Sequence, residues 1–271
     1  MQAFEVKTKD GLTLKVTKWN DVDEGGKGTL IIIHGIGEHQ GRYSHVVKHF
    51  IDHDYVVYTY DQRGHGKSDG KLGHTPDISF NLDDLQRIID SSEGQKLYLY
   101  GHSFGGSVLV NYLLRKEEDS RLVAAVLSAP WIWLKKQPSK IDVALASVMN
   151  LFYPSFTQNN KIDTTALSTI DQVGIEYLND PLVHPKISAG LFKSFYASGL
   201  YAIEKAGNLS IRTLVIHGED DMIVDPNGSK EFCKNSALAS LKLYSNTRHE
   251  LHNDKRAEEV LGYVSDWLES Q

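Results

Sequence analysis

The chain has 271 residues, a length that suits one large domain or a core with a modest insertion. Hydrophobic residues make up 41% and charged residues 24%, which permits a sizeable core, and the net charge of −6 argues against a nucleic-acid-binding surface. The single cysteine, Cys233, excludes an intrachain disulfide and is expected to be a small packing residue.

The N-terminal third predicts a hairpin followed by buried strands. Residues 4–8 (FEVKT) and 12–16 (LTLKV) alternate apolar and polar side chains around Asp10-Gly11, a favoured turn pair. The continuous apolar run TLIIIHG is typical of a strand that is buried on both faces. Similar runs recur at residues 55–61, 96–101, 123–130, 212–218 and 240–246, with helix-compatible segments between them. This alternation predicts an α/β fold with a mostly parallel central sheet and helices on both faces.

One long segment breaks this alternation. Between the sixth predicted strand and residue 211 no clear buried strand appears, whereas residues 141–152 place apolar side chains at helical spacing. We therefore predict a helical cap at residues 131–208, inserted between a first core part at 1–130 and a second at 209–271.

Residues 101–105, GHSFG, match the Gly-x-Ser-x-Gly pattern of a nucleophile at the join of a strand and a helix. A sharp turn there forces Ser103 into a strained backbone conformation, and Gly101 and Gly105 remove side chains that would collide. The N-terminus of the following helix then directs free N–H groups at the reaction centre. We interpret Ser103 as a nucleophile; the competing interpretation is a glycine-rich turn whose serine caps the helix.

Serine needs a histidine base, and the histidine needs a carboxylate that fixes its tautomer. In this fold the chain order is serine, acid, histidine. The segment VIHGEDDMIV offers Asp221, the preferred acid, with Asp220 and Glu219 as alternatives. After the last strand, SNTRHELHND offers His249 as the base, and His252 follows nearly one helical turn later.

Two backbone N–H groups are expected to bind the oxyanion of the tetrahedral intermediate. One belongs to Phe104, the residue after the nucleophile. The other is expected from Ile36 in the loop HGIGEHQGRY, where Gly35 and Gly37 let the backbone bend toward the ester oxygen.

A second glycine-rich loop, YDQRGHGKSDG, lacks the full spacing of a phosphate-binding loop, so a nucleotide site is not expected. Asp61, Arg63 and His65 are instead predicted to brace loops near the nucleophile. The histidines show no metal-binding cluster, and neither a metal nor another cofactor is predicted.

Five motifs together resemble a known family. HGIGEHQGRY, DQRGHGKSDG, GHSFGGS, HGEDDMIV and RHELHND, in this order, look like the monoacylglycerol lipase and lysophospholipase branch of the α/β-hydrolase superfamily. The resemblance spans residues 30 to about 254, although the cap matches in size and place rather than in sequence. It implies a Ser103–Asp221–His249 triad with an oxyanion hole from Ile36 and Phe104.

The resemblance also implies that Glu38, Arg42 and His252 hold the glycerol end of a substrate; the competing interpretation is loop bracing. The expected reaction is hydrolysis of fatty-acid esters through an acyl-enzyme, with monoacylglycerols cleaved to glycerol and free fatty acid. A lysophospholipase or general carboxylesterase would use the same triad. An aminopeptidase would need an acidic cap site such as Glu176 or Asp180, and a non-catalytic binding protein would normally have lost triad members.

The cap suggests an apolar acyl chain. Its apolar side chains are expected to line a tunnel or to form a membrane-docking face, and the competing interpretation is packing between cap helices: Trp131, Ile132, Trp133, Leu145, Val148, Met149, Leu151, Phe152 and Phe156. No signal peptide and no run approaching ~20 apolar residues is found. The expected partner is a small amphiphilic lipid ester, with transient membrane contact, and the expected location is the cytoplasm, in part peripheral at membranes.

Overall fold

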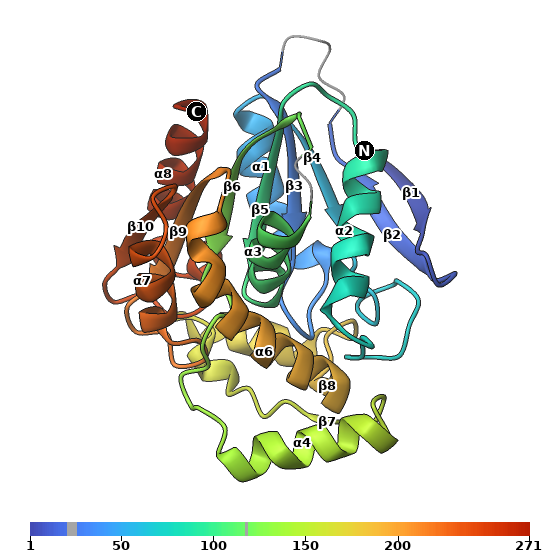
Figure 1. The fold of residues 1–271 in the computed structure, drawn as a ribbon. Helices are drawn as coiled ribbons and strands as arrows, with labels where there is room; N and C mark the ends of the chain where they lie inside the picture. The colour runs from blue at the N-terminus through green and yellow to red at the C-terminus, as the bar shows by residue number, and fades with distance from the viewer. Residues whose placement is uncertain (21–25, 117–118) are drawn as a thin grey trace.

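The computed structural model describes residues 1–20, 26–116 and 119–271. Its centre is a sheet of eight strands in the order β1-β2-β4-β3-β5-β6-β9-β10 (Figure 1). The strands are β1 (Gln2–Lys7), β2 (Thr13–Lys18), β3 (Gly28–Ile33), β4 (Tyr55–Tyr60), β5 (Leu97–His102), β6 (Leu122–Ser128), β9 (Arg212–Gly218) and β10 (Ala239–Tyr244). The β1–β2 and β2–β4 pairs are antiparallel and every later neighbour pair is parallel, so the predicted hairpin extends one edge of a parallel sheet.

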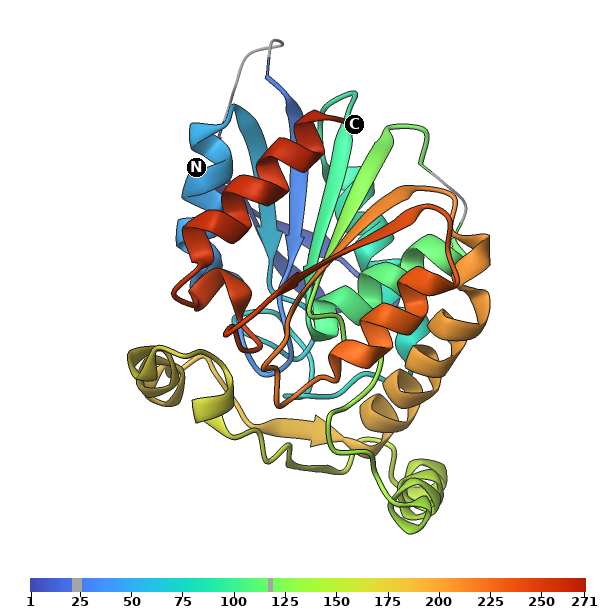
Figure 2. The same cartoon turned by 90° about the vertical axis from the view of Figure 1, so that its left-hand side faces the viewer.

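Helices cover both faces of this sheet, as Figures 1 and 2 show. α1 (Ser44–Asp52) and α8 (Ala257–Glu269) lie on one face, whereas α2 (Ile78–Ser91), α3 (Phe104–Arg115) and α7 (Pro226–Lys234) lie on the other. The alternation of side chains along a strand explains the two cores. In β3, Leu30 and Ile32 pack with the α1 and α8 side, and Ile31 and Ile33 pack with the α2 and α3 side.

The segment between β6 and β9 lies across the carboxyl ends of the parallel strands (Figure 2). It contains α4 (Lys140–Phe152), β7 (Thr157–Asn159), α5 (Asp171–Asn179), β8 (Lys186–Ser188) and α6 (Ala189–Lys205). β7 and β8 pair as a small antiparallel sheet that the helical pattern did not predict. Their three residues each are too few to show a period in the sequence.

Two parts of this inserted segment differ in their packing. α6 lies against the core, where Phe195 contacts Phe104 of α3 with 4.4 Å between ring centroids. α4 lies at the far edge of the molecule, away from the central sheet (Figure 1). Among the described helices, none combines the length and apolarity that crossing a bilayer requires.

The α/β-hydrolase prediction is confirmed: the sheet is mostly parallel, helices cover both faces, and the insertion follows the sixth strand. Parallel strands place their carboxyl ends at one edge of the sheet, which is where ligands bind in such folds. The loops after β3, β5 and β9 therefore meet at that edge, under the inserted segment.

Candidate active site

Ser103 occupies the tight turn between β5 and α3. Its φ of 52° is in the left-handed region, a strained conformation for a serine. A side chain at Gly101 would come within 2.6 Å of the Gly105 carbonyl oxygen, and one at Gly105 within 2.3 Å of the Ile33 carbonyl oxygen. Glycine is therefore required at both positions. Ser103 precedes the first turn of α3 but makes no side-chain capping bond, which removes the competing capping interpretation.

Three side chains from separate loops meet at this turn. The Ser103 hydroxyl donates to Nε2 of His249 over 2.9 Å, and Nδ1–H of His249 donates to Oδ2 of Asp221 over 2.7 Å. All three residues are buried. Glu219 and Asp220, the alternative acids, are exposed. The geometry matches a nucleophile, a base and an acid that orients the base.

The negative charge of Asp221 and a positive charge on His249 stabilise each other. Burial by itself would raise the pKa of Asp221, but His249 and His217 outweigh burial and hold that pKa well below its ordinary value. Burial would likewise lower the pKa of His249, but the Asp221 carboxylate outweighs burial and raises it. The site can therefore hold a proton on His249 when Ser103 gives one up.

The two expected oxyanion donors flank Ser103. Phe104 is the first residue of α3, and N–H groups in the first turn of a helix have no helical acceptor. Ile36 lies in the loop after β3 and lines the cavities next to Ser103. Within the described residues, the N–H of Ile36 has no hydrogen-bond acceptor. Both groups are thus free to bind an oxygen.

Glu38 and Arg42 belong to a buried ion network beside the triad. Arg42 donates twice to Glu250, over 2.8 Å each, and also pairs with Glu38. Glu38 further accepts from the Tyr43 hydroxyl over 2.7 Å. Burial would raise the pKa of Glu38. Arg42, with smaller contributions from His102, His34 and Tyr43, outweighs burial and holds that pKa at about 2. The ring of Tyr177, from α5, lies 4.9 Å from the Arg42 guanidinium.

The structure does not bring all three predicted glycerol-binding residues to one cavity. Glu38 lines a cavity with Ser103 and His249, but Arg42 and His252 do not. His252 is fully buried, stacked on Tyr43 at 4.8 Å between ring centroids.

Two hollows open at Ser103. The larger has a volume of about 200 Å³ and mainly apolar walls: Ile36, Trp131, Leu134, Ile162, Ile187, Phe192, Ile223 and Val224. The smaller, about 20 Å³, has mixed walls: Glu38, His102, Tyr177 and Glu250 lie beside the apolar Ile36, Ile162 and Leu167. Ser103 thus lies between an apolar space and a mixed one that contains two carboxylates.

Only part of the predicted apolar cap set reaches this site. Trp131 lines the larger cavity, Ile132 is buried in the core, and Trp133 and Met149 are half-buried. The side chain of Leu145 lies outside the described residues. The remaining members are exposed: Val148, Leu151, Phe152 and Phe156.

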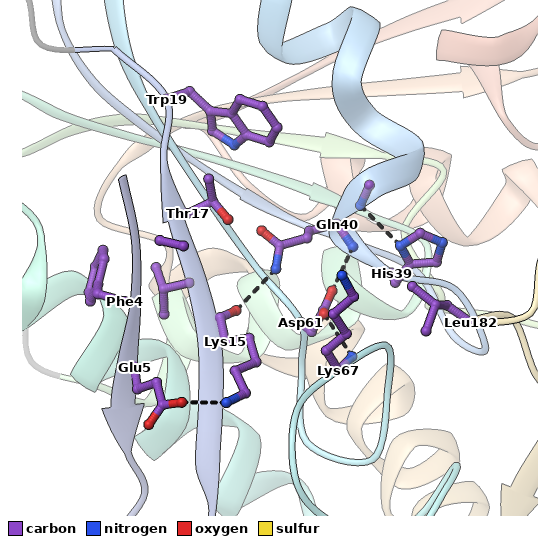
Figure 3. A pocket seen from close by; sticks show the side chains of 13 residues that line it. Phe4, Glu5, Lys15, Thr17, Trp19, His39, Gln40, Asp61, Lys67 and Leu182 are labelled. Atoms are coloured by element: carbon purple, nitrogen blue, oxygen red, sulfur yellow. Dashed lines mark hydrogen bonds and ion pairs between the residues drawn. The ribbon is translucent and has the colours of Figure 1, made fainter. Parts of the chain in front are cut away.

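A separate hollow of about 490 Å³ lies between β1, β2 and the loop after β3 (Figure 3). Its polar groups already bind one another: Lys15 pairs with Glu5, and the Gln40 amide donates to the Lys15 carbonyl over 3.1 Å. Asp61 accepts backbone N–H groups from Gln40 and Lys67, each over 2.9 Å. These contacts brace the hairpin against the neighbouring loops.

The other two predicted bracing residues also join separate segments. Arg63 binds Asp84 of α2 and Asp10 of the hairpin turn. The ring of His65 stacks on the ring of Phe104, with 5.7 Å between the ring centroids.

The sequence reasoning did not identify two residues beside the triad. His217 hydrogen-bonds Asp221, and Glu250 holds Arg42. His217 comes directly before Gly218 at the end of the strand, only four residues before the preferred acid. Glu250 follows the preferred base. For both residues, the signal that the sequence offered was their closeness in the chain to a predicted member of the triad.

Comparisons with known proteins agree with this geometry. A family model described as "Serine aminopeptidase, S33" matches residues 25–256. A monoacylglycerol lipase from Mycolicibacterium smegmatis is 31% identical over 92% of this chain and 90% of its own. An uncharacterized abhydrolase domain-containing protein from Dictyostelium discoideum is 34% identical over 97% of this chain, which spans only 28% of that protein's length.

A solved structure is also similar to this chain. The monoacylglycerol lipase of Paleococcus ferrophilus superposes with a TM-score of 0.87 at 27% identity, covering 100% of this chain and 99% of that one. The resemblance seen in the five sequence motifs is confirmed.

The buried histidines predict how stability depends on pH. Burial lowers the pKa of His34, His65, His102 and His252, that of His102 to about 3. In the unfolded chain each titrates near ~6.5, so below that pH the unfolded state binds protons that the native state does not. The free energy of unfolding is expected to fall below about pH 6.5, by up to ~1.4 kcal/mol per pH unit for each histidine that stays neutral.

Urea unfolding at several pH values between about 7.5 and 5 measures this loss. His249, whose pKa is raised, works in the opposite direction only above about pH 6.5, because its contribution is already complete below the pKa of the unfolded chain. In His252→Phe, an aromatic ring without a titratable group remains on Tyr43, so the slope should become shallower. A free energy of unfolding that does not change over this range would contradict the expectation.

Proposed function

The chain belongs to the serine aminopeptidase S33 family of α/β-hydrolases, and we propose that it hydrolyses monoacylglycerols to glycerol and free fatty acid. The protein is a serine hydrolase of carboxylic esters. The observation that carries the substrate proposal is the position of Ser103 between an apolar cavity and a smaller one that contains the carboxylates of Glu38 and Glu250. A monoacylglycerol has the same polarity: an acyl chain on one side of the ester and a glycerol on the other.

The catalytic residues in this proposal are Ser103, His249 and Asp221. His249 Nε2 takes the proton from the Ser103 hydroxyl as the oxygen attacks the ester carbonyl. The carbonyl oxygen becomes negative against the N–H groups of Ile36 and Phe104, which form the oxyanion hole. As the tetrahedral intermediate collapses, His249 gives its proton to the leaving glycerol oxygen and the acyl group stays on Ser103. Water, deprotonated by His249, then attacks the acyl-enzyme, and His249 returns that proton to the Ser103 oxygen as the fatty acid leaves.

The acyl chain occupies the apolar cavity of about 200 Å³. Burial of apolar surface there supplies affinity without fixing the chain by hydrogen bonds. Trp131 and Phe192 line it together with aliphatic side chains from the loop that follows β9, such as Val224.

The glycerol end occupies the smaller cavity, beside the carboxylates of Glu38 and Glu250. Glu38 lines it, and Arg42, which does not line it, forms an ion pair with the Glu38 carboxylate. His252 supports the stack of rings behind Glu38 rather than touching glycerol directly, because the cavity lining does not include it. At about 20 Å³ this cavity has room for roughly one water molecule, so it must widen when glycerol enters.

An aminopeptidase is not favoured. Glu176 is exposed and bonds Gln172, and Asp180 pairs with His39, so neither carboxylate faces Ser103. The acids that do line the site, Glu38 and Glu250, are both paired with Arg42, which leaves these three residues with one net negative charge. A cationic substrate amine would have to compete with Arg42 for either carboxylate. A lysophospholipase or a general carboxylesterase remains less favoured, because a relative that is matched over 90% of its own length is a monoacylglycerol lipase.

The α4 helix provides a surface for transient membrane contact. Ile141, Val148 and Phe152 are spaced so that they share one face of the helix, and Leu151 adjoins them. Leu151 and Phe152 are 76% and 74% exposed. An exposed apolar helix face of this kind binds the boundary between head groups and acyl chains. The proposed location is the cytoplasm, with peripheral contact at membranes.

Fluorophosphonate labelling and a substrate panel test the main proposal. Wild type should be labelled and Ser103→Ala should not, because the probe reacts with an activated serine. Wild type should hydrolyse a monoacylglycerol faster than the methyl ester of the same fatty acid, the matching lysophospholipid and an amino-acid anilide. Equal labelling of the two proteins would refute the nucleophile; equal rates on the monoacylglycerol and the methyl ester would refute the glycerol site.

Exchanging neighbouring aspartates tests the acid. Asp221→Asn should lower kcat by about 10⁴, since an amide neither fixes the tautomer nor stabilises the charged His249. Asp220→Asn, one residue away and exposed, should stay within about twofold of wild type. Steady-state kinetics at neutral pH measures both, and the reverse pattern would transfer the role to Asp220.

Sedimentation with phosphatidylcholine vesicles tests the membrane surface. The double variant Leu151→Asp/Phe152→Asp should lose most vesicle binding, because binding scales with the apolar area that enters the interface. Leu238→Asp changes an exposed leucine outside the inserted segment and should bind like wild type. Binding that is unchanged in the double variant would exclude α4 as the contact.

A further inference from the structure

Asp221 receives four hydrogen bonds, only one of which comes from His249. Its Oδ1 accepts the backbone N–H groups of Ile223 and Val224, over 2.8 and 2.9 Å. Its Oδ2 is shared: Nδ1 of His249 lies 2.7 Å away and Nε2 of His217 lies 3.1 Å away. Two imidazole rings therefore compete for one carboxylate oxygen.

His217 is held in place from its other side. It lies in β9, and its Nδ1 is 2.8 Å from the Ser229 hydroxyl oxygen in α7. His217, Asp221 and Ser229 all have no measurable exposure to solvent. An ionised carboxylate can only accept, so the proton of His217 must be on Nε2. In the neutral ring Nδ1 then accepts from the Ser229 hydroxyl, which selects that tautomer.

We propose that His217 is a positioning residue for the catalytic acid: its Nε2–H, oriented by Ser229, holds the Asp221 carboxylate and shares its negative charge with His249. The inference rests on the proposed ester hydrolysis and adds a residue to it. His217 touches neither the substrate nor the reacting atoms, since it does not line either cavity at Ser103.

Two consequences follow from the shared oxygen. A carboxylate with four donors has one orientation, so His249 is presented to Ser103 with its Nε2 free of a proton. The second N–H also withdraws charge from Oδ2, which limits how far Asp221 raises the pKa of His249. The other groups that act on His249 include Glu38, Glu250, His252 and the ring of His102 at 4.8 Å, and the change at His217 replaces none of them.

The test compares His217→Leu, which keeps the bulk of the ring without a donor, with His217→Gln, whose amide N–H can reach the same oxygen. For His217→Leu, kcat should fall about tenfold, the effect of one hydrogen bond to a charged group, with KM little changed. The acid limb of its kcat–pH profile should move to higher pH, because the unshared carboxylate holds the proton on His249 more tightly. His217→Gln should restore both values toward wild type.

Rates are measured with p-nitrophenyl butyrate and a monoacylglycerol in parallel, and melting temperatures report folding. Turnover of the p-nitrophenyl ester without turnover of the monoacylglycerol would refute the proposed substrate and leave this test intact. A folded His217→Leu with wild-type kcat and an unmoved acid limb overturns the positioning role. So does a His217→Gln that behaves like His217→Leu, because the role would then be packing.

A second measurement needs no variant that must fold. Nitrogen NMR of the ¹⁵N-histidine-labelled wild type reports which ring nitrogen of His217 carries a proton. A proton on Nε2 at neutral pH supports the proposal. A ring protonated only on Nδ1 cannot donate to Asp221 and overturns it.

Discussion

The strained turn at Ser103 is the constraint on which the rest of the site depends. A serine with φ of 52° costs about 1–3 kcal/mol, and the surrounding structure must over-determine it. Three backbone hydrogen bonds of 2.9 Å do so: Ser103 N–H donates to Ser128, and its carbonyl accepts from Ser107 and Trp131. These partners belong to β6, α3 and the start of the inserted segment, so the turn at the nucleophile is held only when sheet, helix and insertion are all in place.

Burial makes the neighbouring charges effective. In a site without water each charge needs a partner of opposite charge. The structure provides such partners in two layers, the first at Asp221 and the second at Arg42. Asp221 faces His249 and His217; Arg42 faces Glu38 and Glu250. The first layer carries the proton transfer of the proposed reaction, and the second forms the wall where the proposed glycerol end lies. Removing one partner from either layer would leave a buried charge without compensation.

The inserted segment separates the two ends of the proposed substrate. Its Trp131, Ile162 and Phe192 contribute to the apolar cavity, whereas its Tyr177 lines the smaller one next to Arg42. α6 ties the segment to the core through Phe195 and Phe104, and α4 leaves apolar side chains exposed to solvent. One insertion thus lines the site, packs on the core and carries the proposed surface for membrane contact.

The sequence by itself determined the sheet, the turn at Ser103 and the order of the loops, because apolar runs, glycines and chain order are local signals. It also favoured Asp221 over Asp220, and only the tertiary structure shows that Asp221 faces His249 while Asp220 points to solvent. The β7–β8 pair, the burial of His252 and the link from Ser229 through His217 to Asp221 were likewise decided by tertiary contacts. Each depends on which distant segments meet in space, and no local pattern of residues encodes that.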